Sequence, residues 1–155
     1  MNKLLSILLT SFLLYGCDNI ETPFKKSNDK SNIDKESHIG VLMSNAIDNP
    51  FFSKAFQAFQ AYGNDHENIK IISNDAHDNQ QSQFEALDKM IASGVQAIII
   101  NMVDTTQSSV VIDKAKSAGI PVVFFNRNPG ENILSTYNKA LFIGSDDVQG
   151  GYYKD

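Results

Sequence analysis

The sequence is short of several residue types, and each shortage excludes a class of structure or partner. Its 155 residues include no tryptophan. They include one cysteine, so no disulfide can form within the chain. Lysine and arginine together number 13 against 18 aspartates and glutamates, and the basic residues are scattered. A nucleic-acid surface needs clustered cations to neutralise phosphates, so we expect no nucleic-acid partner.

Catalytic and cofactor motifs are also missing. No G-x-G-x-x-G follows the first expected strand, where a nucleotide-binding fold would place its phosphate loop. No serine lies in a G-x-S-x-G motif, and the single cysteine, Cys17, lies in the leader. His66 and His77 lack a partner at the spacing of a helical metal site. The sequence therefore predicts no enzyme, no cofactor and no metal site.

Residues 1–16 have the composition of a secretory signal peptide. Lys3 precedes an apolar stretch, Leu4–Leu14, which is short for a bilayer span. The stretch runs into Leu14–Cys17, Leu-Tyr-Gly-Cys, which resembles the lipobox of bacterial lipoproteins. The resemblance implies cleavage before Cys17, acylation of that residue, and a periplasmic or cell-surface protein anchored to the membrane by lipid. The alternative is a plain secretory signal with an incidental cysteine.

Residues 17–37 are expected to form the lipidated cysteine and a disordered tether. The segment is rich in Asn, Asp, Lys, Ser and Glu and has almost no apolar residues, so it cannot bury enough surface to fold. From His38 onward the composition changes, and apolar runs alternate with helical patterns. We therefore place the start of the folded part at residue 38.

Short apolar runs predict five strands, and helical spacing between the first four predicts three helices. The runs are Ile39–Met43, Ile69–Ile72, Val95–Ile100, Val122–Phe125 and Ala140–Gly144. The fourth run is apolar throughout, which is typical of a parallel strand that is buried on both faces. The helices are expected to end at Gly63, Gly94 and Gly119.

Strands that alternate with helices pair in parallel through right-handed crossovers. The expected fold class is therefore α/β, a doubly wound parallel sheet with strand order 2-1-3-4-5 and a switch point beside the first strand. Ligands of such sheets bind at the carboxyl ends of the strands. The aromatic stripe on the first helix, which includes Phe56 and Phe59, is expected to be core.

Polar and aromatic side chains follow the expected strands at this edge of the sheet. They are Asp48, Asn49, Phe51 and Phe52 after the first strand, Asn101 after the third, and Asn126 and Arg127 after the fourth. Carboxylate, carboxamide and guanidinium groups match vicinal sugar hydroxyls in pairs, and an aromatic ring covers the apolar face of a sugar. The alternatives are that Asp48–Pro50 is only a helix start and that Asn126 and Arg127 only cap loops.

Four stretches in order resemble the periplasmic sugar-binding proteins of the galactose/glucose and ribose type, which serve ABC importers and chemoreceptors. These stretches are Asp48–Phe52, Ile100–Asp104, Pro121–Pro129 and Ile143–Asp146. The resemblance covers Ile39–Gly151 and implies the N-terminal lobe of a type I periplasmic-binding-protein-like fold. Phe124–Pro129 and Tyr137–Ala140 look more like the galactose/glucose branch, whereas Asn49–Phe52 looks more like the ribose branch.

The resemblance implies roles in binding a monosaccharide. Asn126 would hydrogen-bond sugar hydroxyls, with Arg127 beside it. Phe51 would stack on the sugar ring, and Phe52 would support it or add a second ring. The implied partners are a galactose-, glucose- or ribose-like sugar, an ABC transporter permease and a chemoreceptor.

Three further polar residues have less definite roles. Asp48 or Asn49 would supply the polar contact from the first loop, and because this loop is one residue longer than in the galactose type, both stay open. Asn101 matches a position that shapes or supports the site in the ribose branch.

Members of this family have two lobes that close over the ligand. Residues 38–145 match the first lobe, and residues 146–155 match the hinge crossing and the start of the second lobe. We therefore expect a truncated chain that lacks the C-terminal lobe, from an interrupted gene or an incomplete sequence. The alternatives are a nonfunctional remnant and the sugar-effector domain of a transcription repressor, which would need a basic helix-turn-helix before His38.

Overall fold

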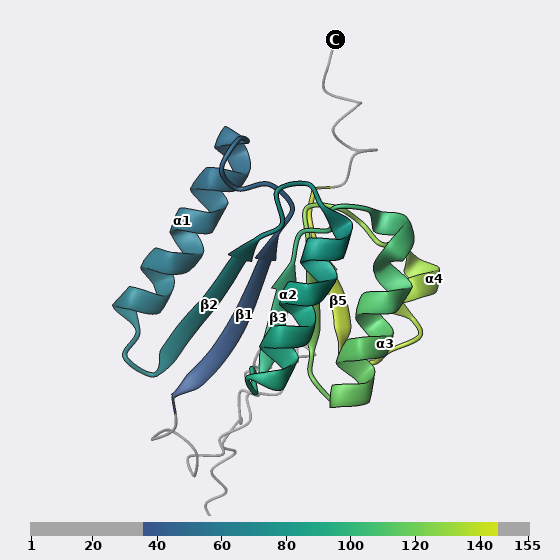
Figure 1. The fold of residues 1–155 in the computed structure, drawn as a ribbon. Helices are drawn as coiled ribbons and strands as arrows, with labels where there is room; N and C mark the ends of the chain where they lie inside the picture. Colours follow the sequence, from purple (N-terminus) through teal and green to yellow (C-terminus); the bar gives the residue numbers. More distant parts are fainter. Residues whose placement is uncertain (1–35, 146–155) are drawn as a thin grey trace, which may run out of the picture. The chain divides into compact units, whose positions relative to one another are not determined.

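Strands and helices alternate along residues 36–145, the part of the chain that the computed structural model describes (Figure 1). The strands are β1 (Ser37–Met43), β2 (Ile69–Asp75), β3 (Ala97–Ile100), β4 (Val122–Phe125) and β5 (Ala140–Ile143). The helices are α1 (Pro50–Asp65), α2 (Gln80–Ala92), the 3₁₀ turn η2 (Thr105–Gln107), α3 (Ser108–Ala118) and α4 (Glu131–Leu134). The predicted signal peptide, Cys17, most of the tether and the hinge segment 146–155 lie outside the described residues.

The strands form one parallel sheet in the order β2-β1-β3-β4-β5. The chain moves outward from β1 to β2 and then returns to the other side of β1 with β3, so the switch point lies beside β1. A row of paired residues, Leu42, Ile100, Phe124 and Phe142, crosses four of the strands near their carboxyl ends. The predicted α/β fold and strand order are confirmed.

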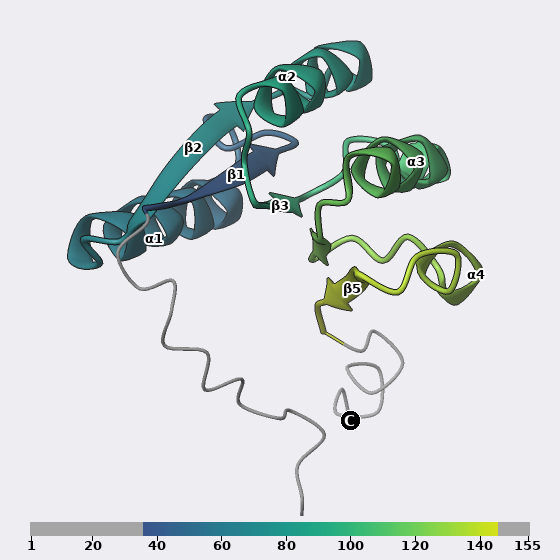
Figure 2. The same ribbon diagram turned by 90° about the horizontal axis from the view of Figure 1, so that it is seen from below.

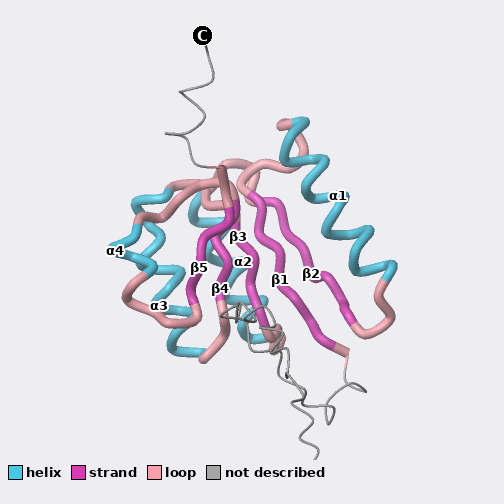
Figure 3. The backbone as a smooth tube through the Cα atoms, turned by 180° about the vertical axis from the view of Figure 1, so that it is seen from behind, coloured by secondary structure: helices cyan, strands magenta, loops and turns pink. Residues whose placement is uncertain are grey.

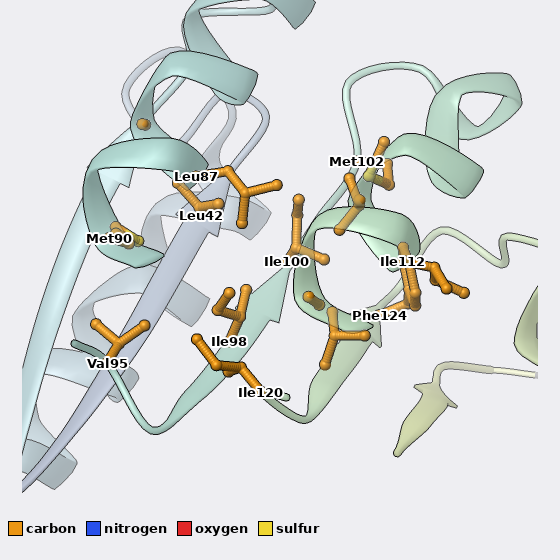
Figure 4. Packing of buried hydrophobic residues seen from close by; sticks show 14 of the residues in the cluster. Leu42, Leu87, Met90, Val95, Ile98, Ile100, Met102, Ile112, Ile120 and Phe124 are labelled. Carbon is orange, nitrogen blue, oxygen red and sulfur yellow. The ribbon is translucent and has the colours of Figure 1, made fainter. Parts of the chain in front are cut away.

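The main core lies between the sheet and the helices α2 and α3 (Figure 4). Leu42, Ile98 and Phe124 from the sheet and Leu87 from α2 have no exposed surface, and Ile112 from α3 is 1% exposed. Burying a side chain of this size stabilises the fold by about 1.5–3 kcal/mol. Alternate residues of β3 and β4 point to this core, and Ile99 and Phe125 between them pack against the cluster on the other face, which explains why both runs read as buried strands.

The opposite face of the sheet is covered less completely. Phe52 of α1 is buried with Val41 and Met43 of β1, and Phe56 and Phe59 are partly buried against this cluster. Figure 2 shows α1 on one side of the sheet and α2 and α3 on the other.

The part of this face formed by β5 is exposed. Leu141 and Ile143 are 45% and 58% exposed. Figure 3 shows α1 beside β2 and β1, and no helix of residues 36–145 over β4 and β5. The second face is therefore only half covered by the described part of the chain.

Two of the three predicted helix ends are confirmed. Gly119 is the C-cap of α3 with a left-handed φ of 71°, and Gly94 follows the end of α2 with a φ of 81°. The third prediction is wrong, because α1 continues through Gly63 to Asp65. A Cβ at Gly63 would lie 2.8 Å from Cγ1 of Ile71, so this glycine permits a close approach of α1 to β2.

The helix α4 has no counterpart among the sequence predictions. Its four residues are too few for a helical period to be visible in the sequence. Its Ile133 and Leu134 pack against the main core. None of the helices within residues 36–145 combines the length and apolar character that crossing a membrane would require.

Candidate binding site at the carboxyl edge of the sheet

The loop after β1 leads into α1 through an asparagine cap. The side-chain oxygen of Asn49 accepts hydrogen bonds from the backbone N–H groups of Phe51 (3.0 Å) and Phe52 (3.4 Å). Pro50 occupies the first helical turn, where its missing N–H costs least. Phe51 is left 58% exposed at the edge of the sheet, whereas Phe52 is 6% exposed and belongs to the core under α1.

The turn after β4 places Asn126 and Arg127 at the same edge. Asn126 has a φ of 66°, a left-handed conformation that asparagine tolerates better than most residues, and its N–H donates to the carbonyl of Ile143 at 2.8 Å. Nη1 of Arg127 donates to the carbonyl oxygens of Met102 (2.8 Å) and Val103 (2.7 Å), which follow β3. The guanidinium is therefore held against the neighbouring strand outlet.

The outlets of β1 and β4 face each other. Cζ of Arg127 lies 6.0 Å from the ring centroid of Phe52, within the range of a cation–π contact. The rings of Phe51 and Phe52 meet edge to face with their centroids 5.3 Å apart. The structure thus brings Phe51, Phe52 and Arg127 to one side of the molecule, as the predicted site requires.

The buried side chain of Asn101 connects the carboxyl ends of β1, β3 and β4. It has no exposed surface, its Oδ1 accepts from Oγ of Ser44 after β1, and its Nδ2 donates to the carbonyl of Phe125 in β4 at 3.0 Å. Both ends of the side-chain amide are therefore bound within the protein. In this structure Asn101 supports the edge, which is one of the roles that the resemblance implies.

An open hollow of about 700 Å³ lies at this edge beside Arg127. It is lined by Val103, Asp104, Thr105, Asn126, Arg127, Asn128 and Ser145. Two of the predicted site residues, Asn126 and Arg127, are in the lining, whereas Asp48, Asn49, Phe51, Phe52 and Asn101 are not. The hollow falls in the size range of small-molecule sites, about 300–1,000 Å³.

The chemistry of the lining is that of reversible polar binding. Arg127 and the amides of Asn126 and Asn128 donate hydrogen bonds, and Thr105 and Ser145 carry hydroxyls that both donate and accept. One carboxylate oxygen of Asp104 accepts hydrogen bonds from the N–H and the hydroxyl of Thr106, so Asp104 caps the turn η2 that precedes α3.

The loop after β2 has a structural role. Oδ2 of Asp75 accepts from the N–H groups of Ala46 (2.9 Å) and Ile47 (3.0 Å), and Oδ1 accepts from that of His77 at 3.1 Å. This carboxylate therefore fixes the course of the loop after β1. Among residues 36–145 there is no group of three or more His, Cys, Asp or Glu side chains that could hold a metal ion.

Sequence reasoning missed Asp75, Ser44 and Gln83 as residues that organise the edge. Gln83 has no exposed surface although it is polar, and it lies one helical turn before the core residue Leu87. A polar residue at a core position of an amphipathic helix was the signal that could have found it.

Comparison with known proteins finds relatives that are named as binding proteins. It is 40% identical over 83 residues to the D-galactose/methyl-galactoside binding periplasmic protein MglB of Haemophilus influenzae, a match that covers 54% of this chain and 25% of that protein. It is 30% identical over 153 residues to the ribose import binding protein RbsB of Bacillus subtilis, covering 97% of this chain and 48% of that protein. Both relatives are named for binding rather than catalysis. This chain spans about half or less of the length of each of these relatives.

Solved structures agree with the fold. An ABC transporter periplasmic solute binding protein from Actinobacillus succinogenes with bound D-allose matches with a TM-score of 0.66 and 25% identity, over 76% of this chain and 41% of that one. A solute binding protein from Bacillus halodurans with bound myo-inositol matches with a TM-score of 0.64 and 28% identity, over 74% of this chain and 38% of that one. The family described as periplasmic binding protein domain matches residues 39–153. The chain therefore belongs to the periplasmic binding protein domain family, as the resemblance of four of its stretches predicted.

Proposed function

We propose that this chain supplies one wall of a binding site for a neutral monosaccharide, as the solute-binding component of an ABC sugar import system. The observation that carries the proposal is the contact of Arg127 with Phe52, which in turn contacts Phe51, beside a polar hollow. A fixed guanidinium and an exposed aromatic ring, joined through the buried ring of Phe52, suit a ligand with hydroxyls on one side and C–H groups on the other.

The predicted site residues have different roles in the proposed sugar binding. Asn126 and Arg127 line the hollow and donate hydrogen bonds to sugar hydroxyls. Phe51, which is 58% exposed, stacks on the sugar ring. Phe52 is 6% exposed, so it supports Phe51 and Arg127 instead of adding a second stacking surface.

The polar contact from the first loop is assigned to Asp48. The side-chain oxygen of Asn49 already accepts two hydrogen bonds as the cap of α1. The carboxylate of Asp48 is exposed, and no hydrogen bond joins it to another described residue. An exposed carboxylate can accept from two hydroxyls at once, which favours Asp48 as the contact.

The proposed sugar class is a hexose or pentose of the galactose, glucose or ribose kind. The relatives are named for galactose, methyl-galactoside and ribose, and a solved relative holds D-allose. The ligands of these relatives differ in ring and hydroxyl pattern, so a panel of sugars is needed to find the preferred one. The proposed protein partners are a transporter permease and a chemoreceptor.

The domain organisation that we propose rests on the family resemblance, because most of its segments lie outside the described residues. It comprises a lipoprotein signal peptide (1–16), an acylated Cys17 with its tether (17–37), the first lobe (38–145) and a hinge crossing into a second lobe (146–155). Labelling with radioactive palmitate tests the anchor. We expect label on the unaltered chain and none on Cys17→Ser.

Calorimetric titration of the purified chain with galactose, glucose and ribose tests the binding function. The described wall leaves the hollow open to water, so we expect weak binding, with a Kd of about 1 mM for the best sugar. Arg127→Met removes a donor from the wall and should abolish measurable heat. The matched control Lys70→Met also removes a cation, from an exposed position in β2, and should bind as the unaltered chain does.

Two outcomes would contradict the proposal. One is the absence of heat with every sugar, both for this chain and for the same chain extended by a second lobe. The other is equal affinity of the Arg127→Met and Lys70→Met variants. Cooperative unfolding that no sugar shifts would favour the alternative of a remnant that folds without binding.

A further inference from the structure

A fully buried glutamine in α2 is bonded to the backbone that follows β3. Nε2 of Gln83 donates to the carbonyl of Asn101 at 2.9 Å, and its Oε1 accepts from the N–H of Val103 at 3.1 Å. Gln83 has no exposed surface and does not line the hollow. A buried amide that satisfies two specific backbone groups is costly to replace, because its loss leaves both groups unpaired.

The contact reproduces the pairing of a parallel β-sheet. In a parallel ladder, one residue donates to the carbonyl of one neighbour and accepts from the N–H two positions further along. The side-chain amide of Gln83 does the same to Asn101 and Val103. The side-chain amide of Gln83 thus pairs with the backbone directly beyond Ile100, the last residue of β3.

Arg127 binds the same stretch of backbone. The carbonyl oxygens of Met102 and Val103 both accept from Nη1 of Arg127. Met102 has no exposed surface, and its side chain lies in the main core. The Met102 carbonyl belongs to the same peptide unit as the Val103 N–H, which Gln83 holds, so the guanidinium contact with Met102 depends on the orientation that Gln83 fixes.

Gln80 extends this arrangement by one residue. Its Nε2 donates to Oε1 of Gln83 at 3.3 Å, and its Oε1 accepts from the N–H of Asp104 at 2.8 Å. Two glutamines on one turn of α2 thus hold the consecutive N–H groups of Val103 and Asp104, and both of these residues line the hollow.

We infer that Gln83 is a positioning residue of the sugar site, which fixes the Met102 carbonyl that helps to orient the Arg127 guanidinium. The inference rests on the proposed function for its effect on sugar binding. The placement of Arg127 by Gln83 can be measured without a sugar.

The test compares Gln83→Met with the unaltered chain. Methionine keeps the length and the buried volume but cannot make either hydrogen bond. We expect hydrogen exchange of the Val103 amide to accelerate about tenfold and the affinity for the best sugar to fall about tenfold, the factor that corresponds to one or two lost hydrogen bonds. The Nε–H resonance of Arg127 should shift, while amides of β3 such as Ile98 stay protected.

A matched control lies on the same helix. Gln81→Met makes the same change at an exposed position whose side chain bonds only to Glu85 within α2. It should leave the Arg127 resonance, the exchange of the Val103 amide and the sugar affinity unchanged. If Gln83→Met does not fold, Gln80→Met tests the same support at a half-buried position, with faster exchange at Asp104 as the expected result.

The outcomes separate this inference from the proposed function. An unaltered chain that binds no sugar contradicts the proposed function, whereas the Arg127 resonance and the Val103 exchange still decide the role of Gln83. A Gln83→Met chain with an unchanged Arg127 resonance, or with unaltered sugar affinity where the parent binds, would overturn the positioning role.

Discussion

At the scale of single residues, the neighbours Asp48 and Asn49 differ in the hydrogen bonds that their side chains make. The oxygen of Asn49 is used by the first N–H groups of α1, whereas the carboxylate of Asp48 is exposed. The Asp-Asn-Pro run predicts a ligand contact, with a helix start alone as the alternative. Only the direction of each side chain distinguishes the two roles.

The capping role of Asn49 gives a stability prediction. Asn49→Ala should lower the free energy of unfolding by about 1 kcal/mol, because two N–H groups of α1 lose their acceptor. Asn49→Gly should cost only about 0.3 kcal/mol, since glycine also suits a cap position. Urea denaturation measures both. Equal costs for the two variants would show that the cap contributes little.

Asn101 and Gln83 show the limit of prediction at this scale. The sequence places Asn101 at a strand outlet, where a carboxamide suits a sugar. The structure uses that carboxamide to tie Ser44 to Phe125. Such a network depends on three chain segments that are far apart in sequence, so no local pattern reveals it.

At the scale of elements, helix starts and strands were predictable because their signals are local. The apolar runs identify all five strands, with ends that differ by a few residues from those in the structure. β2 extends to Asp75, where the sequence suggested a loop after Ile72. The extension follows from the pairing of β2 with β1 up to Met43, a contact that polar residues such as Asn74 do not signal.

The end of α1 was predicted wrongly for a related reason. A glycine after an apolar stripe usually marks a C-cap, but Gly63 instead lets the helix approach Ile71. Glycine can serve either purpose, and the choice depends on the packing of α1 against β2.

Burial predicts a contrast between two leucines. Leu87 in α2 has no exposed surface, whereas Leu141 in β5 is 45% exposed. Leu87→Ala should therefore lower the free energy of unfolding by about 3 kcal/mol through lost burial and a cavity. Leu141→Ala should cost less than about 1 kcal/mol.

The same denaturation series compares the two leucine variants. A cost for Leu141→Ala as large as that for Leu87→Ala would mean that further parts of the chain cover β5. Equal small costs would contradict the packing of the main core.

At the scale of the whole molecule, the described wall predicts stabilisation by ligand. A sugar at ten times its Kd should raise the free energy of unfolding by about 1.4 kcal/mol, because it binds only the folded chain. Thermal unfolding with and without the best sugar measures the effect. Sucrose at the same concentration controls for exclusion of sugar from the protein surface, and Arg127→Met should respond to both sugars alike.

The overall architecture was predictable from the order of elements, and the site only in part. Alternating strands and helices leave few topologies, so the sheet order followed from connection rules. Those rules also bring Arg127 to the same edge of the sheet as the outlet of β1. They do not say that Phe52 turns inward while Phe51 stays exposed, because that choice depends on how α1 packs on Val41 and Met43.

The backbone at Asn126 has a consequence for how such a site can change its solute. With a φ of 66°, the position accepts glycine, asparagine or aspartate far more readily than other residues. Under the proposed sugar-binding function, few residue types can replace Asn126, whereas Asn128 and Ser145, which line the same hollow, have no positive φ and face no such restriction. Drift in solute preference should accumulate at those two neighbours while the turn itself stays nearly fixed.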